Sequence, residues 1–200
     1  MMDEETGSLW SHVIGESLQG THKGKILKTL QVVQTNWNTW VKQHQDTKVL
    51  KKSEEIKSSS YEKYFENPNR LGIFRTIYLQ DRMPGKTLVY GISSGVHQLA
   101  VLDSLLIQGK LRQTDLGDDR IIIFKSKDGG LRVFKDGGYI FKEKTESRFF
   151  MDVKTRSIWD FDQGKCIKGK LSGTELEAVP VTLAYWFAWS TYFPNTEVLD

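Results

Sequence analysis

The chain has 200 residues, of which 38% are hydrophobic and 12% aromatic, and this is enough apolar material for a folded core rather than a disordered chain. Its net charge of +3 is small and its lysines are interleaved with acidic residues, so no nucleic-acid partner is expected. The single cysteine, Cys166, excludes an internal disulfide, and the absence of any run near 18 apolar residues predicts no membrane span.

One pattern, Asp-x-x-Thr-x-Ser-(Leu/Ile)-Trp, occupies residues 3–10 and returns at residues 152–159. A shift of 149 positions aligns residues 3–50 with 152–199 without a gap, giving 14 identities in 48. Ordinary composition gives roughly 3 by chance. All six tryptophans form pairs at this shift: Trp10/Trp159, Trp37/Trp186 and Trp40/Trp189. The sequence therefore predicts an internal duplication, with two related modules that each contain several elements.

Each copy opens with a strand-like stretch, residues 8–13 and 157–162, followed by a stretch with glycines at matching positions. Because glycine adopts positive φ without strain, this spacing predicts tight turns around two short strands. A helix is expected next. In the first copy one inward stripe is expected to hold Trp37, Trp40, Val41 and His44, with Thr35 as the N-cap. In the second copy residues 182–193 are expected to form a helix that is buried on more sides.

The remaining sequence divides into a connector and a folded region. Residues 51–85 are interpreted as a connector with one strand at 72–79 and aromatic anchors at Tyr61, Tyr64 and Phe65. From Lys86 onward, residues 87–95 predict a strand, 101–109 a short helix, and 119–143 a three-stranded meander through two Gly-Gly turns. The expected fold class is α+β and β-rich. The expected domains are the carboxy-terminal half of module one (1–50), the connector (51–85) and a complete module two (86–200).

Sequence motifs that would indicate a phosphate-binding, metal or catalytic site are weak. Residues 164–170 resemble the front of a phosphate-binding loop, but Leu171 stands where a Mg²⁺ ligand belongs. The Asp128–Gly129 pair is interpreted as a hairpin turn, and the four histidines never occur at ligand spacing. No metal, cofactor or catalytic residue is therefore predicted. Weak candidates for binding are the repeated polar and tryptophan positions, whose alternative roles are turn formation and core packing: Asp3, Ser8, Trp10, Asp152, Ser157 and Trp159.

The combined motifs resemble a known family. They are the Asp-x-x-Thr-Gly-Ser-Leu-Trp-Ser opening, the spaced glycines, the Trp-x-x-Trp segment, QDRMPGKTLVYGI at 80–92 and AYWFAWSTYFPNTEVL at 184–199. Together they are similar to the uncharacterised domain of unknown function 3179. The resemblance implies a Cys-Pro-x-Cys type segment ahead of the first motif, which this sequence lacks. It lends no established reaction, and it leaves enzyme activity and compartment open, with an extracytoplasmic full-length form as one expectation.

Two functions remain open from the sequence. The first is a non-catalytic binding or structural module. The second is a redox or metal-thiol protein whose active cysteines lie in a segment missing before Met1. Module two has residues 86–151 ahead of Asp152, whereas only Met1 and Met2 precede Asp3, so an amino-terminal truncation is expected. The strand around Leu9, Trp10 and Val13 is then expected to present an unpaired edge and to drive self-association.

Overall fold

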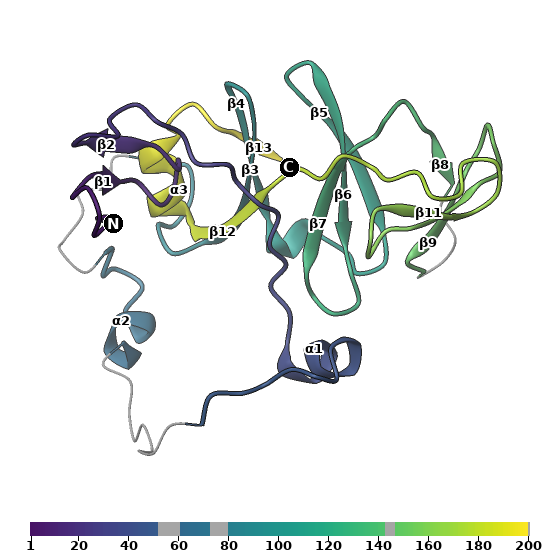
Figure 1. Cartoon of the computed structure of the whole chain (residues 1–200). Helices are drawn as coiled ribbons and strands as arrows, with labels where there is room; N and C mark the ends of the chain where they lie inside the picture. Colours follow the sequence, from purple (N-terminus) through teal and green to yellow (C-terminus); the bar gives the residue numbers. More distant parts are fainter. Residues whose placement is uncertain (52–60, 73–79, 143–146, 200) are drawn as a thin grey trace.

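The computed structural model describes residues 1–51, 61–72, 80–142 and 147–199. The protein is β-rich with few helices, and its strands form several small sheets. Along the second half of the chain these elements are stacked in four layers, which follow one another from left to right in Figure 1. They are helix α3 (Trp186–Tyr192), a helix-side sheet, a central sheet and an outer sheet.

The helix-side sheet has the strand order β12-β3-β4-β13 and is covered on both faces. Its strands are β12 (Val181–Tyr185), β3 (Leu88–Ser94), β4 (His97–Leu102) and β13 (Glu197–Leu199), and only β13 runs parallel to its neighbour. Because side chains alternate along a strand, Val89 and Ala100 face α3 whereas Ile92, Leu99 and Val101 face the central sheet. Trp186 and Trp189 complete the core on the α3 side.

The central sheet consists of β5 (Leu111–Leu116), β6 (Asp119–Lys125) and β7 (Leu131–Lys135) in that order. Strand β6 contains four consecutive buried apolar residues. Ile121 and Ile123 join the core shared with the helix-side sheet, while Ile122 and Phe124 join the core shared with the outer sheet. A continuous apolar run is what a strand buried on both faces requires.

The outer sheet has the order β11-β10-β9-β8. Its strands are β8 (Phe141–Lys142), β9 (Phe149–Asp152), β10 (Ile158–Asp160) and β11 (Lys165–Lys168). Its aromatic side chains form a network of edge-to-face contacts with the central sheet, such as Phe124 with Phe150 at 5.8 Å between ring centroids. Trp159, Phe161 and Cys166 complete this core.

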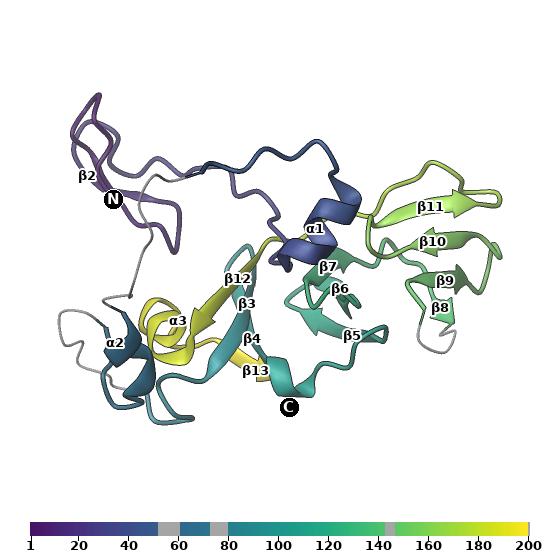
Figure 2. The ribbon, with the colours of Figure 1, turned by 90° about the horizontal axis from the view of Figure 1, so that it is seen from below.

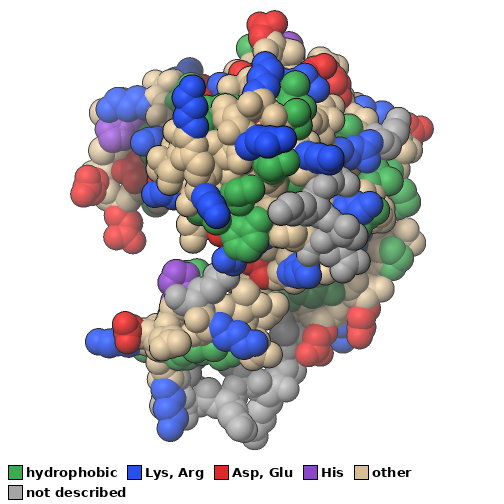
Figure 3. Space-filling model, turned by 90° about the vertical axis from the view of Figure 1, so that its right-hand side faces the viewer, with side chains coloured by type: hydrophobic (Ala, Val, Ile, Leu, Met, Phe, Trp, Pro, Cys, Tyr) green, Lys and Arg blue, Asp and Glu red, His purple; other side chains and the backbone are tan. Residues whose placement is uncertain are grey.

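The described residues up to Glu66 contribute peripheral elements. They are β1 (Leu9–Trp10), β2 (Ser17–Gln19), α1 (Trp37–Gln43) and α2 (Glu62–Glu66). Figure 1 shows α1 below the stacked layers, and Figure 2 shows the β1–β2 hairpin apart from them. In the space-filling view the lower part of the molecule, where α1 lies, projects from the body with hydrophobic side chains on its surface (Figure 3).

Matching positions in the two halves have matching local structure. Leu9 pairs with Gln19 and Trp10 with Ser17, while Ile158 pairs with Lys168 and Trp159 with Cys166, and both hairpins shift register after the first pair. Helices α1 and α3 begin and end at equivalent residues. The surroundings differ, because the strands β12 and β13 have no counterpart around α1 in the described residues.

Three predicted elements differ from the structure. Residues 182–185 form the end of β12 rather than a helix, because they pair with β3 in an unbroken ladder. A helix was expected at residues 101–109. Instead, β4 continues to Leu102 and is followed by a 3₁₀ turn (Asp103–Leu105). The predicted meander contains β6, β7 and β8, but β8 pairs with β9 of the outer sheet instead of β7. The strand expected at 72–79 lies, apart from Gly72, outside the described residues.

The predictions for the first 66 residues also need correction. The tryptophan stripe of α1 does not face inward, since Trp37 is 53% and Trp40 39% exposed. The N-cap is Asn36 rather than Thr35, and the Asn36 side-chain oxygen accepts a hydrogen bond from the Thr39 N–H at 2.9 Å. In the connector, α2 has no buried residue, and the expected anchor Phe65 is 61% exposed.

The edge of β1 is not open. The Trp10 N–H donates to the Met1 carbonyl at 2.6 Å, and the Asp3 N–H donates to the Ser8 carbonyl at 3.1 Å. Residues 1–3 thus cover β1 much as β9 covers β10, where the Asp152 N–H donates to the Ser157 carbonyl at 3.0 Å. Self-association through an unpaired backbone edge at Leu9 and Trp10 therefore loses its basis, although the Leu9 side chain stays exposed.

Candidate functional site

A cleft with a volume of about 620 Å³ lies at the seam between the helix-side and central sheets. One wall is aliphatic and comes from β3, β7 and β12: Leu88, Leu131, Val181 and Leu183. The other wall carries polar groups, chiefly Tyr90, Asp103, Lys125 and Asp128. A strap of residues 31–36, which runs ahead of α1, borders the cleft through Val32, Gln34, Thr35 and Asn36. The cleft therefore offers an apolar surface beside hydrogen-bonding groups, as small-molecule sites usually do.

Three side chains from different elements meet at the polar wall. Lys125, at the end of β6, lies with its Nζ 2.6 Å from Oδ1 of Asp103 at the start of the 3₁₀ turn. The hydrogen bond from Lys125 lowers the pKa of Asp103, and Tyr90 of β3 contributes a second hydrogen bond. Burial, followed by the hydrogen bond to Asp103, raises the pKa of Tyr90 to about 12. At neutral pH the group therefore contains an ionised Asp103 and a neutral Tyr90 hydroxyl.

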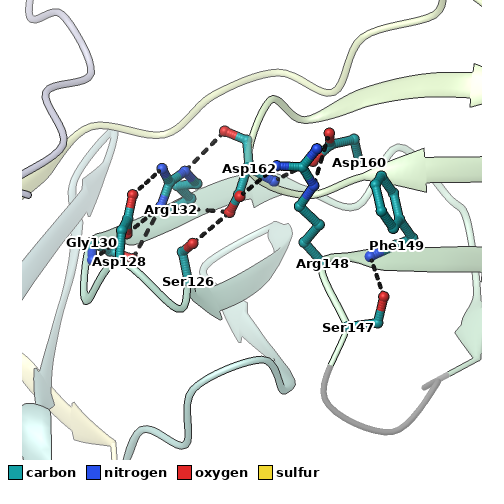
Figure 4. A network of polar contacts seen from close by, with 9 residues as sticks. All are labelled: Ser126, Asp128, Gly130, Arg132, Ser147, Arg148, Phe149, Asp160 and Asp162. Atoms are coloured by element: carbon teal, nitrogen blue, oxygen red, sulfur yellow. Dashed lines mark hydrogen bonds and ion pairs between the residues drawn. The ribbon is translucent and has the colours of Figure 1, made fainter. Parts of the chain in front are cut away.

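A second charged pair supports the turn between β6 and β7 (Figure 4). Arg132 donates from Nη1 and Nη2 to the two carboxylate oxygens of Asp128, at 3.2 and 3.0 Å, and both side chains are almost fully buried. Burial alone would raise the pKa of Asp128, but the hydrogen bonds from Arg132 and from the Gly130 N–H outweigh it, so this pKa is lowered. A two-pronged arginine–carboxylate contact fixes geometry, so the turn is held rigidly.

The same network continues into the outer sheet. The Arg132 Nε donates to the Asp162 carbonyl at 2.9 Å, and the Ser126 hydroxyl donates to the Asp162 carboxylate at 2.6 Å. Arg148 bridges Asp162 and Asp160, with N–O distances of 3.4 Å to each (Figure 4). Burial raises the pKa of Asp160. Because Arg132 and Ser126 of the β6–β7 hairpin both bond to Asp162, the network ties the cleft's turn to the outer sheet.

The strap is packed closely against this turn. A side chain at Gly130 would place its Cβ 2.4 Å from Val33 Cγ1 and 3.0 Å from the Gln34 carbonyl oxygen, so only glycine fits. The Gln31 side-chain N–H donates to the Val133 carbonyl at 3.3 Å. The Thr35 hydroxyl oxygen is buried without a hydrogen-bond partner. Buried hydroxyls usually have a hydrogen-bond partner, so Thr35 is an exception within the strap.

The predicted site residues of the first copy form a turn at the other end of the molecule. Asp3 accepts hydrogen bonds from the Thr6 N–H at 2.7 Å and from Trp10 Nε1 at 2.8 Å, and Ser8 contacts the Thr6 hydroxyl at 2.7 Å. The Trp10 hydrogen bond is the largest cause that lowers the pKa of Asp3 to about 2. These contacts hold the turn, and a small hollow beside it is lined by Met1, Met2, Trp10, His22 and Leu27.

The second copy repeats this turn inside the body. Asp152 accepts from the Thr155 N–H at 2.8 Å, and the Thr155 hydroxyl donates to Ser157 at 2.9 Å. Asp152, Ser157 and Trp159 are all 0% exposed, so a ligand does not reach them in this structure. Burial would raise the pKa of Asp152, but hydrogen bonds from Thr155 and from backbone N–H groups lower it overall. The two sets of predicted residues are not brought together.

The cleft residues were missed because no short motif joins them. Tyr90, Asp103 and Lys125 are far apart in sequence and meet only where two sheets pack. Asp128 and Gly129 were expected to form a hairpin turn, and they lie in the β6–β7 turn. The glycine pair after Asp128 was the available signal, since Gly130 marks the close approach of the strap.

Among the described residues, no three or more His, Cys, Asp or Glu side chains gather in a way that holds a metal ion. Cys166 is a free thiol buried in the core between the central and outer sheets. No helix within the described ranges is long and apolar enough to cross a membrane.

Comparison with known proteins decides the family. The family model described as protein of unknown function (DUF3179) matches residues 1–196. The chain belongs to this family. No curated protein and no solved structure gives a significant match. The DUF3179 match includes every residue that lines the cleft, from Val32 to Leu183, and leaves out only β13 among the described strands, so the cleft lies wholly inside the family's domain.

Proposed function

We propose that the chain is a non-catalytic binding module that takes a small molecule with an aliphatic body and a polar head into the cleft beneath the strap. The observation that carries the proposal is the pairing of the charged groups in the cleft. Asp103 is bonded to Lys125 and Asp128 to Arg132, and both carboxyl pKa values are lowered. A general acid needs a raised carboxyl pKa, so these groups suit recognition better than proton transfer.

The shape of the cleft supports the ligand class. The aliphatic wall accommodates a short hydrocarbon chain, while Asp103 and Tyr90 lie on the polar side. Asp103 remains 49% exposed, so its carboxylate is accessible to a ligand's donor group. An alkylamine combines both features, because its ammonium donates to carboxylate and hydroxyl oxygens and its chain covers Leu131 and Leu183.

The proposal is tested by NMR titration of the ¹⁵N-labelled chain with hexylamine and, separately, with hexanoate. We expect hexylamine to shift the amide signals of Leu88, Asp103, Leu131 and Leu183 in a saturable way, and hexanoate to do so much more weakly. The head-group control is Asp103→Asn, which should weaken hexylamine binding about tenfold because it removes a charge-assisted hydrogen bond. Shifts that are absent from the cleft at saturating hexylamine, or that persist unchanged in Asp103→Asn, would contradict the proposal.

We also infer that residues 3–50 and 152–199 arose by internal duplication, with module boundaries at 1–50, 51–85 and 86–200. The equal pairing register, the equal helix bounds and the equivalent Asp-Thr-Ser turns support this inference. A further match is the close approach of glycine to serine. A Cβ on Gly20 would lie 2.8 Å from Ser8 Cα, and one on Gly169 would lie 2.8 Å from Ser157 Cα.

Through-hydrogen-bond NMR couplings test the duplication at the level of individual pairs. The same donor and acceptor positions should couple in both hairpins, including Gly24 N–H to the Ser17 carbonyl and Gly173 N–H to the Cys166 carbonyl. A different set of partners in the β1–β2 hairpin would remove the structural support for the duplication.

A further inference from the structure

Helices α1 and α3 have similar local structure, but the tryptophans of α1 are exposed and those of α3 are buried. Each has seven residues and ends at a residue with nearly the same backbone angles, φ −131° and ψ 72° at His44 and φ −126° and ψ 70° at Phe193. Trp40 Nε1 donates to the Thr47 hydroxyl at 2.8 Å, and Trp189 Nε1 donates to the Thr196 hydroxyl at 3.0 Å. A ring packs on each tryptophan, His44 at 4.0 Å and Phe193 at 4.4 Å between ring centroids.

The site that receives α3 shows what such a helix packs against. Trp189 lies directly over Gly91 of β3, where a Cβ would come within 2.2 Å of the indole ring. The Trp186 N–H donates to the Thr87 carbonyl, and Val89 and Ala100 fill the space beside the rings. Arg82 lies 4.8 Å above the Trp186 ring and donates to the Pro194 and Thr196 carbonyls. The receiving surface is thus an antiparallel strand pair with a glycine, preceded by an arginine.

Helix α1 has no such surface in the described structure. Trp186 and Trp189 are 0% and 2% exposed, whereas their equivalents Trp37 and Trp40 are 53% and 39% exposed. A tryptophan side chain carries about 150–250 Å² of surface that packing can bury. Two half-exposed tryptophans on a helix whose C-cap, length and ring packing already match a docked helix mark an interaction surface.

We propose that the Trp37–Trp40 face of α1 docks onto a β3–β4-type sheet carried by a separate polypeptide of the DUF3179 family. The negative charge of the loop that follows α1 fits a partner that carries an arginine equivalent to Arg82. The loop leaving α1 has Asp46 at the position of Asn195, beside the Gln45 and Thr47 carbonyls that correspond to the two acceptors of Arg82. A partner arginine equivalent to Arg82 would therefore meet a carboxylate as well as two carbonyl groups.

A second copy of this chain does not supply the sheet. One face of its β3–β4 pair is covered by α3, and the other is covered by the central sheet through Ile92, Leu99 and Val101. Docking of α1 onto a second copy would have to displace α3, which is the better-buried helix. The partner must instead carry a β3–β4-type pair whose helix-binding face is free.

The docking is tested with a tethered probe made from the chain's own receiving surface. A second copy of residues 82–151 is joined directly ahead of Asp3, replacing Met1 and Met2, as residues 82–151 precede Asp152. Tethering raises the local concentration of the probe so that no partner has to be identified first. Hydrogen exchange with mass spectrometry follows α1, α3 and the original β3. We expect exchange in α1 to slow by at least about tenfold toward the rate of α3, as burial protects a helix from local opening.

The matched control is Gly91→Val in the added segment alone. Gly91 has no positive φ, so valine fits the strand but its side chain overlaps the position of the indole ring. This variant should return α1 to the exchange rate of the 200-residue chain while α3 and the original β3 stay protected. Unchanged exchange in α1 of the tethered protein, or equal protection with Gly91→Val, would overturn the proposal. Protection of α1 that grows with the concentration of the untethered chain would overturn the choice of partner in favour of a second copy.

Discussion

Asp3 and Asp152 lie in the same turn motif but accept hydrogen bonds from different donors. Asp3 accepts a hydrogen bond from Trp10 Nε1, whereas Asp152 accepts from the Ile140 N–H at 3.3 Å. The indole nitrogen of Trp159 is buried without a partner. Both aspartates share contacts from the threonine three residues later, and they differ in one further donor, the Trp10 side chain for Asp3 and the Ile140 backbone for Asp152. This exchange of partners places Trp159 fully in the core while Trp10 stays near the surface.

The Trp10–Asp3 hydrogen bond can be measured through the Asp3 pKa. Trp10→Phe should raise this pKa from about 2 toward the ordinary aspartate value of 3.8, since the largest cause of its lowering is removed. Because the folded-state pKa is lowered, the stability it contributes is present above the unfolded pKa and is lost as pH falls through about 2. NMR titration of the side-chain carboxyl carbon gives the value. Trp37→Phe serves as the control and should leave the Asp3 pKa unchanged.

The cleft residues give a second measurable pKa. Asp103→Asn should lower the pKa of Tyr90 from about 12, but not as far as 10, because burial is the larger cause and persists. With a raised folded-state pKa, the contribution to stability is complete below pH 10 and is lost as pH rises through about 12. NMR titration of the tyrosine ζ-carbons separates Tyr90 from the other tyrosines. If Asp118→Asn in the β5–β6 turn produced the same decrease, the assigned contact would be wrong.

At the scale of elements, α1 and α3 show that local sequence determines the helix, whereas its burial depends on the surface against which it packs. The Trp-x-x-Trp spacing and the C-cap are local, and both segments form a seven-residue helix. Burial is not local, because it depends on the Gly91 surface beneath α3. A helix stripe in sequence therefore indicates which face is apolar, but it does not tell whether anything covers that face.

The two helices provide a matched pair of substitutions. Trp189→Ala should lower the free energy of unfolding by about 3–5 kcal/mol, because it empties a filled position in the core. Trp40→Ala should lower it by about 1 kcal/mol or less, as expected for a surface position. Chemical denaturation of both variants makes the comparison. Equal costs would mean that α1 is packed in solution, in conflict with the exposure of its tryptophans.

The sequence predicted much of the fold's local content and little of its site. Alternation and glycine turns were sufficient for β3, β6 and β7, because each strand's pattern reflects burial along its own length. They failed at residues 182–185, where pairing with β3 overrides a helix-like composition. The cleft escaped prediction because Tyr90, Asp103 and Lys125 meet only through packing of two sheets. Family membership was predictable, since it rests on motifs spread along the chain.

At the scale of the whole molecule, the central sheet joins two cores. Ile123 contributes to the core with the helix-side sheet, and Ile122 to the core with the outer sheet. Each side chain is fully buried, so Ile122→Ala and Ile123→Ala should each lower the free energy of unfolding by about 2–5 kcal/mol. Because both cores share β6, both variants should shift one common transition, observed by fluorescence and by circular dichroism. Two separate transitions in Ile122→Ala would mean that the layers unfold independently.

The two hairpins should also differ in local stability despite equal pairing. The β1–β2 hairpin is peripheral, whereas β10–β11 lies in the outer sheet and packs against the central sheet through Trp159 and Cys166. Local opening is easier where few apolar contacts must be broken. Amides of residues 9–19 should therefore exchange faster than those of residues 158–168. Equal rates measured by NMR hydrogen exchange would contradict the peripheral placement of the first hairpin.

The double burial of β6 also has a consequence for synthesis on the ribosome. The Ile-Ile-Ile-Phe run, residues 121–124, emerges after β3–β5 but before Phe150, Phe161 and Cys166, which cover its second side. At a synthesis rate of about 5–20 residues per second, that face stays uncovered for about a few seconds. A short uncharged segment of β-branched and aromatic residues is prone to cross-β pairing between chains during such an interval. Nascent chains of this protein are therefore expected to need a chaperone most while β7 to β11 are being made.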